Sequence, residues 1–454
     1  PDGLKIVYSA QKTASGAEFF HSDLYEYDLQ KKAETVLVEQ PGQDLFPSYS
    51  PNGKQVVFYS QCGSLVYFGE RQVGIIPSGG GSVRYISRAL DGDVFGGASN
   101  FWWSPDSKKI VFGAGKGTLN HLYSIEVESG KYQTLLQQIS GTSSFSVTSD
   151  GSKIAWLRAF SHKPSDLHIF HTSDASDHSL TDLNPVVKQL PAIQARTIKW
   201  RSKDGMDMEG VLRMPFHHQG KNPVPLLTIL HGGPTGASLE SFPVSRLYPV
   251  QLFLESGYAV FEPNFRGSIN YGAGHRLPTI QQQGFGDMSD VMTGIDSLVE
   301  QGIADSDRLG VMGWSYGGFL SSWMVGHTNR FKAASIGACA MDWTTYYGMS
   351  IGIADAPPEV VREYFGGIPW NNFESYDRHS PRFFLKEVKT PSLLLRGERD
   401  LDTMSEMYVA LKELEVPVSF VTYPREPHGI GEPIHQRDLL RRNLDWFLRW
   451  IPRR

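Results

Sequence analysis

The sequence is poor in three features that would place it in a specialised class of protein. It has only two cysteines, Cys62 and Cys339, in 454 residues, which are too few and too far apart for a disulfide framework or a zinc knuckle. It has no run of about 18 apolar residues, which excludes a transmembrane helix. It has no excess of positive charge, since 43 Lys and Arg against 48 Asp and Glu give a net charge of −5. We therefore expect neither a membrane partner nor a nucleic-acid partner.

Apolar residues are abundant enough to build hydrophobic cores. Hydrophobic residues make up 40% of the sequence and aromatic residues 12%, which excludes an intrinsically disordered chain. At about 150 residues per domain, this length predicts two large domains or three ordinary ones.

A short motif recurs four times in the first part of the sequence. Each copy is a polar turn of Pro, Asp, Asn, Ser or Gly that leads into a β-branched and aromatic strand. The copies begin at positions 1, 50, 104 and 148, and further strands are expected at 23–27, 121–125 and 166–170. Repeats of about 40 to 55 residues with about four strands each are typical of β-propeller blades, and a β-sandwich with similar turns is the alternative. We predict a β-propeller domain with about four visible blades at residues 1–192.

The start of the chain carries no targeting signal. The sequence begins without Met, within the first copy of the repeat, and has no apolar segment typical of a signal peptide. Either the propeller is small or open, or earlier blades precede residue 1, and the start within a repeat favours the second interpretation. The compartment is therefore left open, with the cytoplasm slightly favoured.

Residues 193–454 follow a different pattern. Two strands, at 197–200 and 209–213, flank a Lys-Asp-Gly turn like a hairpin, and apolar strands then alternate with amphipathic helices. This alternation predicts an α/β domain with a mostly parallel sheet. The expected strands lie at 225–230, 258–262, 309–312, 332–340, 392–395 and 418–423, and the expected helices at 288–300, 404–414 and 437–451.

The pattern Gly-x-Ser-x-Gly occurs twice, around Ser315 and around Ser350. It is typical of a sharp strand-to-helix turn that exposes a serine hydroxyl, with glycines where side chains would clash. Ser315 follows the expected strand at 309–312 and precedes a run compatible with a helix, whereas no clear strand precedes Ser350. We predict Ser315 as a nucleophile and interpret the second pattern as a chance match.

A carboxylate and a histidine follow Ser315 in the order that triads of this kind use. Asp400 lies just past the strand at 392–395, and His428 lies past the last expected strand. We predict His428 as the general base and Asp400 as the group that orients it. The rivals are Asp402 and His435, and we expect His435 to face solvent at the start of the terminal helix.

Glycines also follow the strand at 225–230, in the sequence His231-Gly232-Gly233-Pro234. This pattern is typical of a loop whose backbone N–H helps to form an oxyanion hole, and a plain Gly-Gly-Pro turn is the alternative. We interpret His231 as a structural residue, because the loop backbone carries the chemistry.

Three aromatic residues follow the expected strand at 332–340, namely Trp343, Tyr346 and Tyr347. We predict that they line the pocket for the residue whose carbonyl is attacked. Ordinary aromatic packing is the alternative.

These motifs together resemble the prolyl oligopeptidase family of serine peptidases, and most closely its acylaminoacyl-peptidase-like branch. The resemblance covers nearly the whole chain and implies a β-propeller followed by an α/β-hydrolase domain at residues 193–454. It also implies that the oxyanion donors are the N–H groups of Gly233 and Tyr316. The segments that carry it lie at 231–234, 263–268, 271–272, 286–287, 313–319, 380–381, 397–400 and 423–429.

The resemblance implies a serine-type oligopeptidase that hydrolyses short peptides through an acyl-enzyme. We expect neither a metal nor a cofactor, and a homo-oligomer is compatible with the sequence. Whether the substrate has a blocked N-terminus, as for acylaminoacyl peptidases, or a free one, as for dipeptidyl peptidases, is left open. A carboxylesterase-like hydrolase with the same triad and a non-catalytic binding protein are the alternatives. The sequence departs from the family at Arg396, where His is common, and at 402–404, where Val-Pro is usual.

Overall fold

The computed structural model describes residues 2–13, 20–90, 92–94, 101–218, 220, 222–353 and 358–452. The chain forms two compact units. The first contains Pro1–Leu190 and Ile269–Leu277, and the second contains Pro191–Ser268 and Pro278–Arg454.

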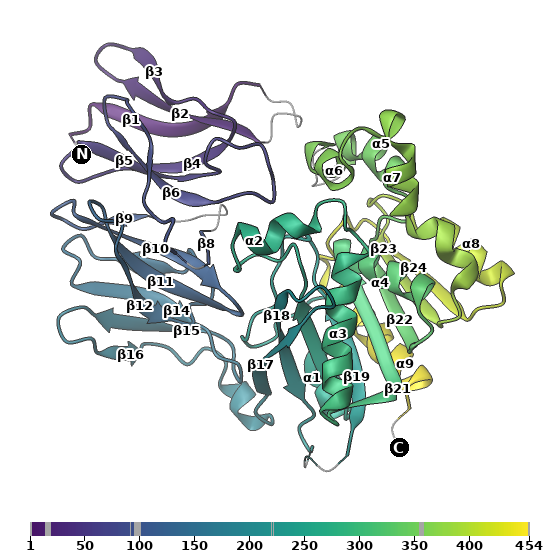
Figure 1. The fold of residues 1–454 in the computed structure, drawn as a ribbon. Helices are drawn as coiled ribbons and strands as arrows, with labels where there is room; N and C mark the ends of the chain where they lie inside the picture. Colours follow the sequence, from purple (N-terminus) through teal and green to yellow (C-terminus); the bar gives the residue numbers. More distant parts are fainter. Residues whose placement is uncertain are drawn as a thin grey trace. The chain divides into compact units, whose positions relative to one another are not determined.

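The first unit is built from antiparallel strands (Figure 1). They fall into four consecutive groups, β1–β3, β4–β7, β8–β12 and β13–β16, and a short parallel pairing of β2 with β4 joins the first two groups. This grouping agrees with the blades expected from the repeats. The strands are β1 (Lys5–Gln11), β2 (His21–Asp28), β3 (Ala33–Val38), β4 (Gly42–Tyr49), β5 (Gln55–Ser60), β6 (Gln72–Pro77), β7 (Arg84–Tyr85), β8 (Asp93–Val94), β9 (Trp102–Trp103), β10 (Lys109–Lys116), β11 (Leu119–Glu126), β12 (Tyr132–Gln137), β13 (Phe145–Val147), β14 (Lys153–Arg158), β15 (Asp166–His171) and β16 (Asp177–Ser179), followed by a 3-10 turn η2 (Pro185–Gln189).

The repeated motif forms the same turn in three groups of strands. In each copy a hydroxyl donates a hydrogen bond to the Asp or Asn two residues later, and the distance is 2.7 Å from Ser50 to Asn52, 2.6 Å from Ser104 to Asp106 and 2.6 Å from Thr148 to Asp150. Side chains of this type replace backbone partners in tight turns. The repeat in the sequence therefore reflects a repeated turn that leads into β5, β10 and β14.

A segment from the second half of the sequence belongs to the first unit. It contains α2 (Ala273–Arg276) and the start of a 3-10 turn, η3 (Leu277–Thr279). Arg276 is fully buried, pairs with the buried Asp93, and donates to the carbonyl oxygens of Phe68 at 3.2 Å and Gly69 at 2.6 Å. A buried guanidinium requires such partners. These bonds fix the segment against the strands of this unit.

The second unit contains an eight-stranded sheet in the order β17-β18-β20-β19-β21-β22-β23-β24. β17 and β18 form the expected antiparallel hairpin, β18 is antiparallel to β20, and the remaining neighbours are parallel. The predicted mostly parallel sheet is therefore correct. The strands are β17 (Gln194–Arg201), β18 (Asp207–Met214), β19 (Val224–Leu230), β20 (Ala259–Asn264), β21 (Ala304–Trp314), β22 (Phe331–Gly337), β23 (Ser392–Gly397) and β24 (Val418–Tyr423).

Helices cover both faces of this sheet, because successive side chains of a strand point to opposite faces. Val260 belongs to a core cluster with Phe253 of α1 and Phe447 of α9. Its neighbour Phe261 faces the other way, and a Cβ atom at Gly294 of α3 would lie 2.9 Å from its ring. The helices are α1 (Val250–Glu255), α3 (Gly286–Glu300), α4 (Tyr316–His327), α5 (Trp343–Ile353), α6 (Pro358–Phe365), α7 (Phe373–Arg378), α8 (Ser405–Glu413) and α9 (Pro433–Trp450), with 3-10 turns η4 (Pro369–Asn371) and η5 (Pro381–Glu387).

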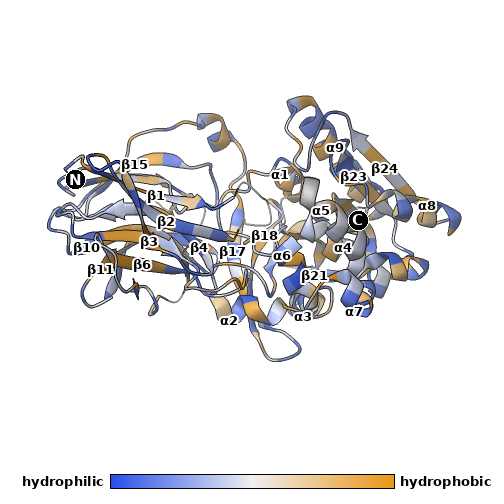
Figure 2. Ribbon diagram, turned by 90° about the horizontal axis from the view of Figure 1, so that it is seen from above, coloured by the Kyte–Doolittle hydropathy of each residue, from blue (hydrophilic) through white to orange (hydrophobic). Residues whose placement is uncertain are grey.

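Helix α8 follows the usual rule for a surface helix. In Figure 2 helix α8 carries both hydrophobic and hydrophilic colour, and Met407 and Leu411 are buried while Val409 is 57% exposed. One apolar stripe packed on the sheet is what a helix of a globular domain requires. None of the helices formed by the described residues is both long and apolar enough to cross a membrane.

Candidate active site

Ser315 stands between β21, which ends at Trp314, and α4, which begins at Tyr316. Its backbone has φ 61° and ψ −123°, a conformation that non-glycine residues rarely adopt and that is found at nucleophile turns. The turn is also tightly packed, since a Cβ atom at Gly313 would lie 2.1 Å from the carbonyl oxygen of Gly317. The strand, turn and helix that a nucleophilic serine requires are therefore all present.

His428 and Asp400 come together beyond the ends of two strands. Asp400 follows β23, His428 follows β24, and His428 Nδ1 lies 2.9 Å from Asp400 Oδ2. A carboxylate only accepts hydrogen bonds, so Nδ1 donates its proton to Asp400 and the lone pair is left on Nε2. That tautomer is the one a general base needs.

The rival residues have other partners. Asp402 Oδ2 lies 3.3 Å from Arg396 Nη2, and the Arg396 guanidinium also donates to the carbonyl oxygen of Asp400 at 3.1 Å. Arg396, where the family often has His, thus links the two aspartates of this loop. Ser350 belongs to helix α5 rather than to the end of a strand.

The expectation that His435 faces solvent is wrong. Its side chain is 13% exposed, and its Nδ1 lies 2.8 Å from Oε1 of the buried Glu426. Glu426 also accepts the backbone N–H groups of Gly431 and Glu432, both at 2.8 Å. A buried carboxylate needs such donors, and His435 supplies one of them. Glu426 lies two residues before His428, so the pair stabilises the loop that carries His428.

The glycine loop after β19 lies against Ser315. A Cβ atom at Gly232 would lie 3.4 Å from Ser315 Cβ and 3.9 Å from Ser315 Oγ. Gly233 has φ 125°, and a Cβ atom there would lie 2.2 Å from the backbone nitrogen of Thr235. The backbone angle at position 233 requires glycine. The lack of a side chain at Gly232 lets the backbone of the loop approach Ser315 closely.

Most of the predicted site residues line one pocket. Tyr347 does not belong to this lining, and packs instead against the rings of Trp370 at 5.7 Å and Tyr376 at 6.2 Å. Phe319 and Tyr364 were not predicted from the sequence, although Phe319 lies one helical turn after Ser315 and within a family motif. The lining residues are Gly233, Ser315, Tyr316, Phe319, Ala338, Ala340, Trp343, Tyr346, Tyr364 and His428.

His231 lies beside this site with a neutral ring. Its Nδ1 is 2.8 Å from the carbonyl oxygen of Gly232, its Nε2 is 2.8 Å from Ser268 Oγ, and burial lowers the pKa of His231 to about 4. A carbonyl oxygen only accepts, so Nδ1 carries the proton. This arrangement fits a structural residue of the loop.

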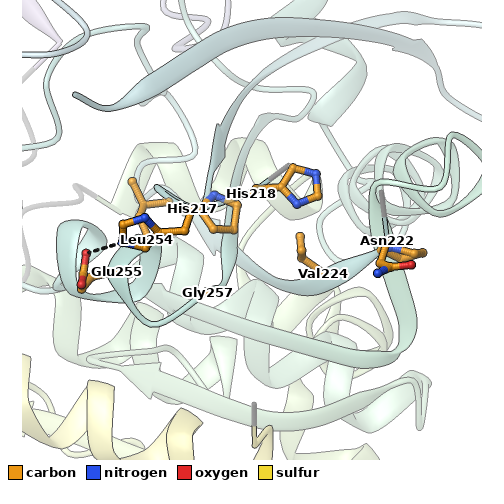
Figure 3. A pocket seen from close by; sticks show the side chains of 9 residues that line it. His217, His218, Asn222, Val224, Leu254, Glu255 and Gly257 are labelled. Carbon is orange, nitrogen blue, oxygen red and sulfur yellow. Dashed lines mark ion pairs between the residues drawn. The ribbon is translucent and has the colours of Figure 1, made fainter. Parts of the chain in front are cut away.

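A second hollow in this unit contains none of the predicted site residues. Figure 3 shows His217, His218, Asn222 and Glu255 around it. His217 Nε2 and Glu255 Oε2 lie 3.8 Å apart, and both side chains are more than half exposed. Exposed pairs of this kind contribute little energy.

Within the described residues, one group could offer three metal ligands, namely Glu426, Glu432 and His435. Glu426 already accepts the three hydrogen bonds given above, and Glu432 pairs with Arg425 at 2.7 Å. Their charges are compensated within the protein, so their geometry does not call for a cation.

Known proteins are similar to this chain in sequence. The model of the prolyl oligopeptidase family matches residues 245–453. The uncharacterized peptidase YuxL of Bacillus subtilis is 29% identical over 81% of this chain, and dipeptidyl-peptidase 5 of Porphyromonas gingivalis is 25% identical over 99%. The chain spans 55% and 66% of the lengths of these two relatives.

A solved structure shares the fold. The acylaminoacyl peptidase of Pyrococcus horikoshii superposes with a TM-score of 0.84 at 24% identity, over 100% of this chain and 70% of that one. The predicted fold class, a β-propeller followed by an α/β-hydrolase domain, is confirmed. Residues 245–453, somewhat less than half of the chain, are similar to the prolyl oligopeptidase family.

Proposed function

We propose that this chain carries the catalytic machinery of a serine-type oligopeptidase, which hydrolyses peptide bonds in short peptides. The main support is the pocket that Ser315 and His428 share with Gly233, together with the 2.9 Å contact between His428 Nδ1 and Asp400 Oδ2. Relatives named acylamino-acid-releasing enzyme, in rat, and dipeptidyl-peptidase 5 favour peptides as the substrate class.

In the first half of the reaction, Ser315 Oγ attacks the carbonyl carbon of the scissile bond while His428 Nε2 takes the hydroxyl proton. Asp400 holds the imidazole in the required tautomer and stabilises the imidazolium. The backbone N–H groups of Gly233 and Tyr316 donate to the oxyanion, and each such donor is worth about 3 kcal/mol in the transition state. Collapse of the tetrahedral intermediate breaks the C–N bond, and His428 returns the proton to the leaving amine.

In the second half, water attacks the acyl group on Ser315. His428 removes a proton from the water, the same N–H groups stabilise the second oxyanion, and the proton passes to Ser315 Oγ as the acid leaves. The reaction needs only groups of this chain and water.

The pocket walls favour an apolar side chain on the residue whose carbonyl is attacked. Among the described lining residues the walls are aromatic rings and the methyl groups of Ala338 and Ala340, and none carries a carboxylate, an ammonium or a guanidinium group. A charged side chain would lose its hydration there without gaining a partner. That Trp343 and Tyr346 line this pocket supports the proposal that they contact the substrate.

The test is a panel of peptides with a free or an acetylated N-terminus, with products identified by mass spectrometry. We expect cleavage after apolar residues by the wild-type chain, no cleavage by Ser315→Ala, and wild-type rates for Ser350→Ala, whose serine lies in the other Gly-x-Ser-x-Gly pattern. Cleavage of simple esters but of no peptide would favour the esterase alternative. Normal turnover by Ser315→Ala would refute the proposed nucleophile.

A further inference from the structure

Three rings stand in a row beside the proposed oxyanion hole. The rings of His231 and Phe265 are nearly parallel, with centroids 4.3 Å apart and an angle of 13°, and those of Phe265 and Tyr316 are 6.1 Å apart at 23°. Phe265 is fully buried and Tyr316 is 4% exposed. A rigid aromatic stack therefore joins the glycine loop after β19 to the first residue of α4.

Hydrogen bonds fix both ends of the stack. At one end His231 Nδ1 donates to the carbonyl oxygen of Gly232 at 2.8 Å, and the single hydroxyl proton of Ser268 goes either to His231 Nε2 at 2.8 Å or to the carbonyl oxygen of Phe265 at 2.6 Å. At the other end the hydroxyl of Tyr316 donates to Asp287 Oδ2 at 2.6 Å. Asp287 is fully buried in the first turn of α3, and its other oxygen accepts the N–H of Met288 at 2.8 Å. Neither outer ring can tilt without breaking a hydrogen bond, which is partly buried at His231 and buried at Tyr316.

Each outer ring also controls a backbone N–H. His231 Nδ1 donates to the carbonyl oxygen of Gly232, and that carbonyl shares one peptide plane with the N–H of Gly233. Fixing the oxygen therefore fixes the direction of the N–H on the opposite side of the plane. The second N–H belongs to Tyr316 itself, so the position of its ring constrains the backbone from which it projects.

We infer that Phe265, clamped between His231 and Tyr316, sets the separation of the two oxyanion donors, and that Phe265 and Asp287 are positioning residues for the reaction. This inference rests on the proposed function, because it assigns a role to groups around the proposed oxyanion hole. None of the stack residues needs to touch the substrate through its ring for this role. The stack residues act on the oxyanion donors, which stabilise the negative charge that develops on the substrate oxygen. We therefore expect them to affect the stability of the transition state and not the binding of the substrate.

The test compares Phe265→Leu with Phe253→Leu. Phe253 is also fully buried, but it packs against Tyr258 and Phe447 on the opposite face of the sheet. For Phe265→Leu we expect kcat to fall about 10- to 100-fold with KM nearly unchanged, as when a reacting group shifts by about 1 Å. Phe253→Leu should lower thermal stability and leave kcat at the wild-type value.

A substrate-independent measurement separates this inference from the proposed function. The rate of labelling by a fluorophosphonate probe depends on the serine and on the oxyanion donors, and not on the peptide. We expect Ser315→Ala to remain unlabelled and Phe265→Leu to react about 10- to 100-fold more slowly than wild type. Labelling of Ser315→Ala would overturn the proposed function. Wild-type labelling and kcat in Phe265→Leu would overturn the inference and leave the proposed function intact.

Asp287 provides a second variant in case Phe265→Leu does not fold. Asp287→Asn keeps an oxygen that accepts from Tyr316, whereas Asp287→Ala removes it. We expect Asp287→Ala to lose kcat and labelling rate together, and Asp287→Asn to recover most of both. Equal rates in the two Asp287 variants would contradict the positioning role.

Discussion

The indole N–H of Trp314 donates a hydrogen bond of 2.8 Å to the carbonyl oxygen of His428. Trp314 immediately precedes Ser315, and it is the last residue of β21. The loop that carries the proposed base is thus tied to the strand that carries the proposed nucleophile. This contact fixes the backbone of His428, whereas Asp400 fixes its ring.

Replacing Trp314 with Phe keeps an aromatic ring and removes the donor. We expect kcat to fall about 10-fold, since one buried hydrogen bond contributes on the order of 1 kcal/mol and its loss lets the loop move. The matched control is Trp103→Phe in the first unit, where the indole donates to the carbonyl oxygen of Ser48 at 3.2 Å. An equal fall in kcat in both variants would show that loss of stability, and not the position of His428, is responsible.

Asp400 and Asp402 offer a test within one loop. Asp400→Asn should lower kcat by about 10⁴-fold, because the amide permits the wrong tautomer of His428. Asp402→Asn removes the charge that pairs with Arg396 but keeps an oxygen that can accept the N–H of Ser405, and the Asp402 side chain is 40% exposed. We expect it to change kcat less than about 3-fold, as surface pairs are weak. Steady-state kinetics on one peptide checks both, and a larger loss in Asp402→Asn would reverse the assignment.

The expected strands of the second unit are all present, because an apolar run bounded by turn residues has few alternatives in a parallel sheet. One strand was expected to reach residue 340, but β22 ends at Gly337, where Ala338 adopts φ 44° and breaks the extended backbone. Helix α5 was not predicted. Its apolar residues surround the whole helix, so the sequence lacks the one-sided periodicity by which a helix is recognised.

The residues of the candidate site also fall into those that can be predicted from the sequence and those that cannot. Ser315, Asp400 and His428 are predictable because each follows a strand at the same edge of the sheet. Tyr364 carries no such signal, because its place in the pocket depends on packing between helices distant in sequence. The partnership of Glu426 with His435 was also missed, since a histidine at a helix start gives no indication of a buried carboxylate nearby. Tertiary contacts, rather than local patterns, decide these cases.

His231 predicts a pH dependence of stability. Burial lowers the pKa of His231 to about 4, below about 6.5 for the unfolded chain. The unfolded state therefore binds more protons between these values, so this residue makes the free energy of unfolding decrease as the pH falls from about 6.5 to 4. In His231→Asn this contribution is absent. We expect urea titrations to show that the difference in free energy of unfolding between wild type and His231→Asn becomes smaller by about 2 kcal/mol from pH 7 to pH 4.5. A difference that stays constant over this range would contradict a neutral His231 ring in the folded state.

Tyr346 and Tyr347 are adjacent in sequence, but only Tyr346 lines the pocket, while Tyr347 packs between Trp370 and Tyr376. Tyr346→Ala should lower kcat/KM for peptides with an apolar residue before the scissile bond by about 10-fold, because substrate contact area is lost. Tyr347→Ala should instead lower the thermal unfolding temperature by several degrees, since a buried aromatic ring is removed, with kcat/KM close to wild type. Kinetics and thermal melts on the two variants check both outcomes. If Tyr347→Ala impairs kcat/KM as much as Tyr346→Ala at a temperature where both are folded, the pocket wall extends further than the lining described above.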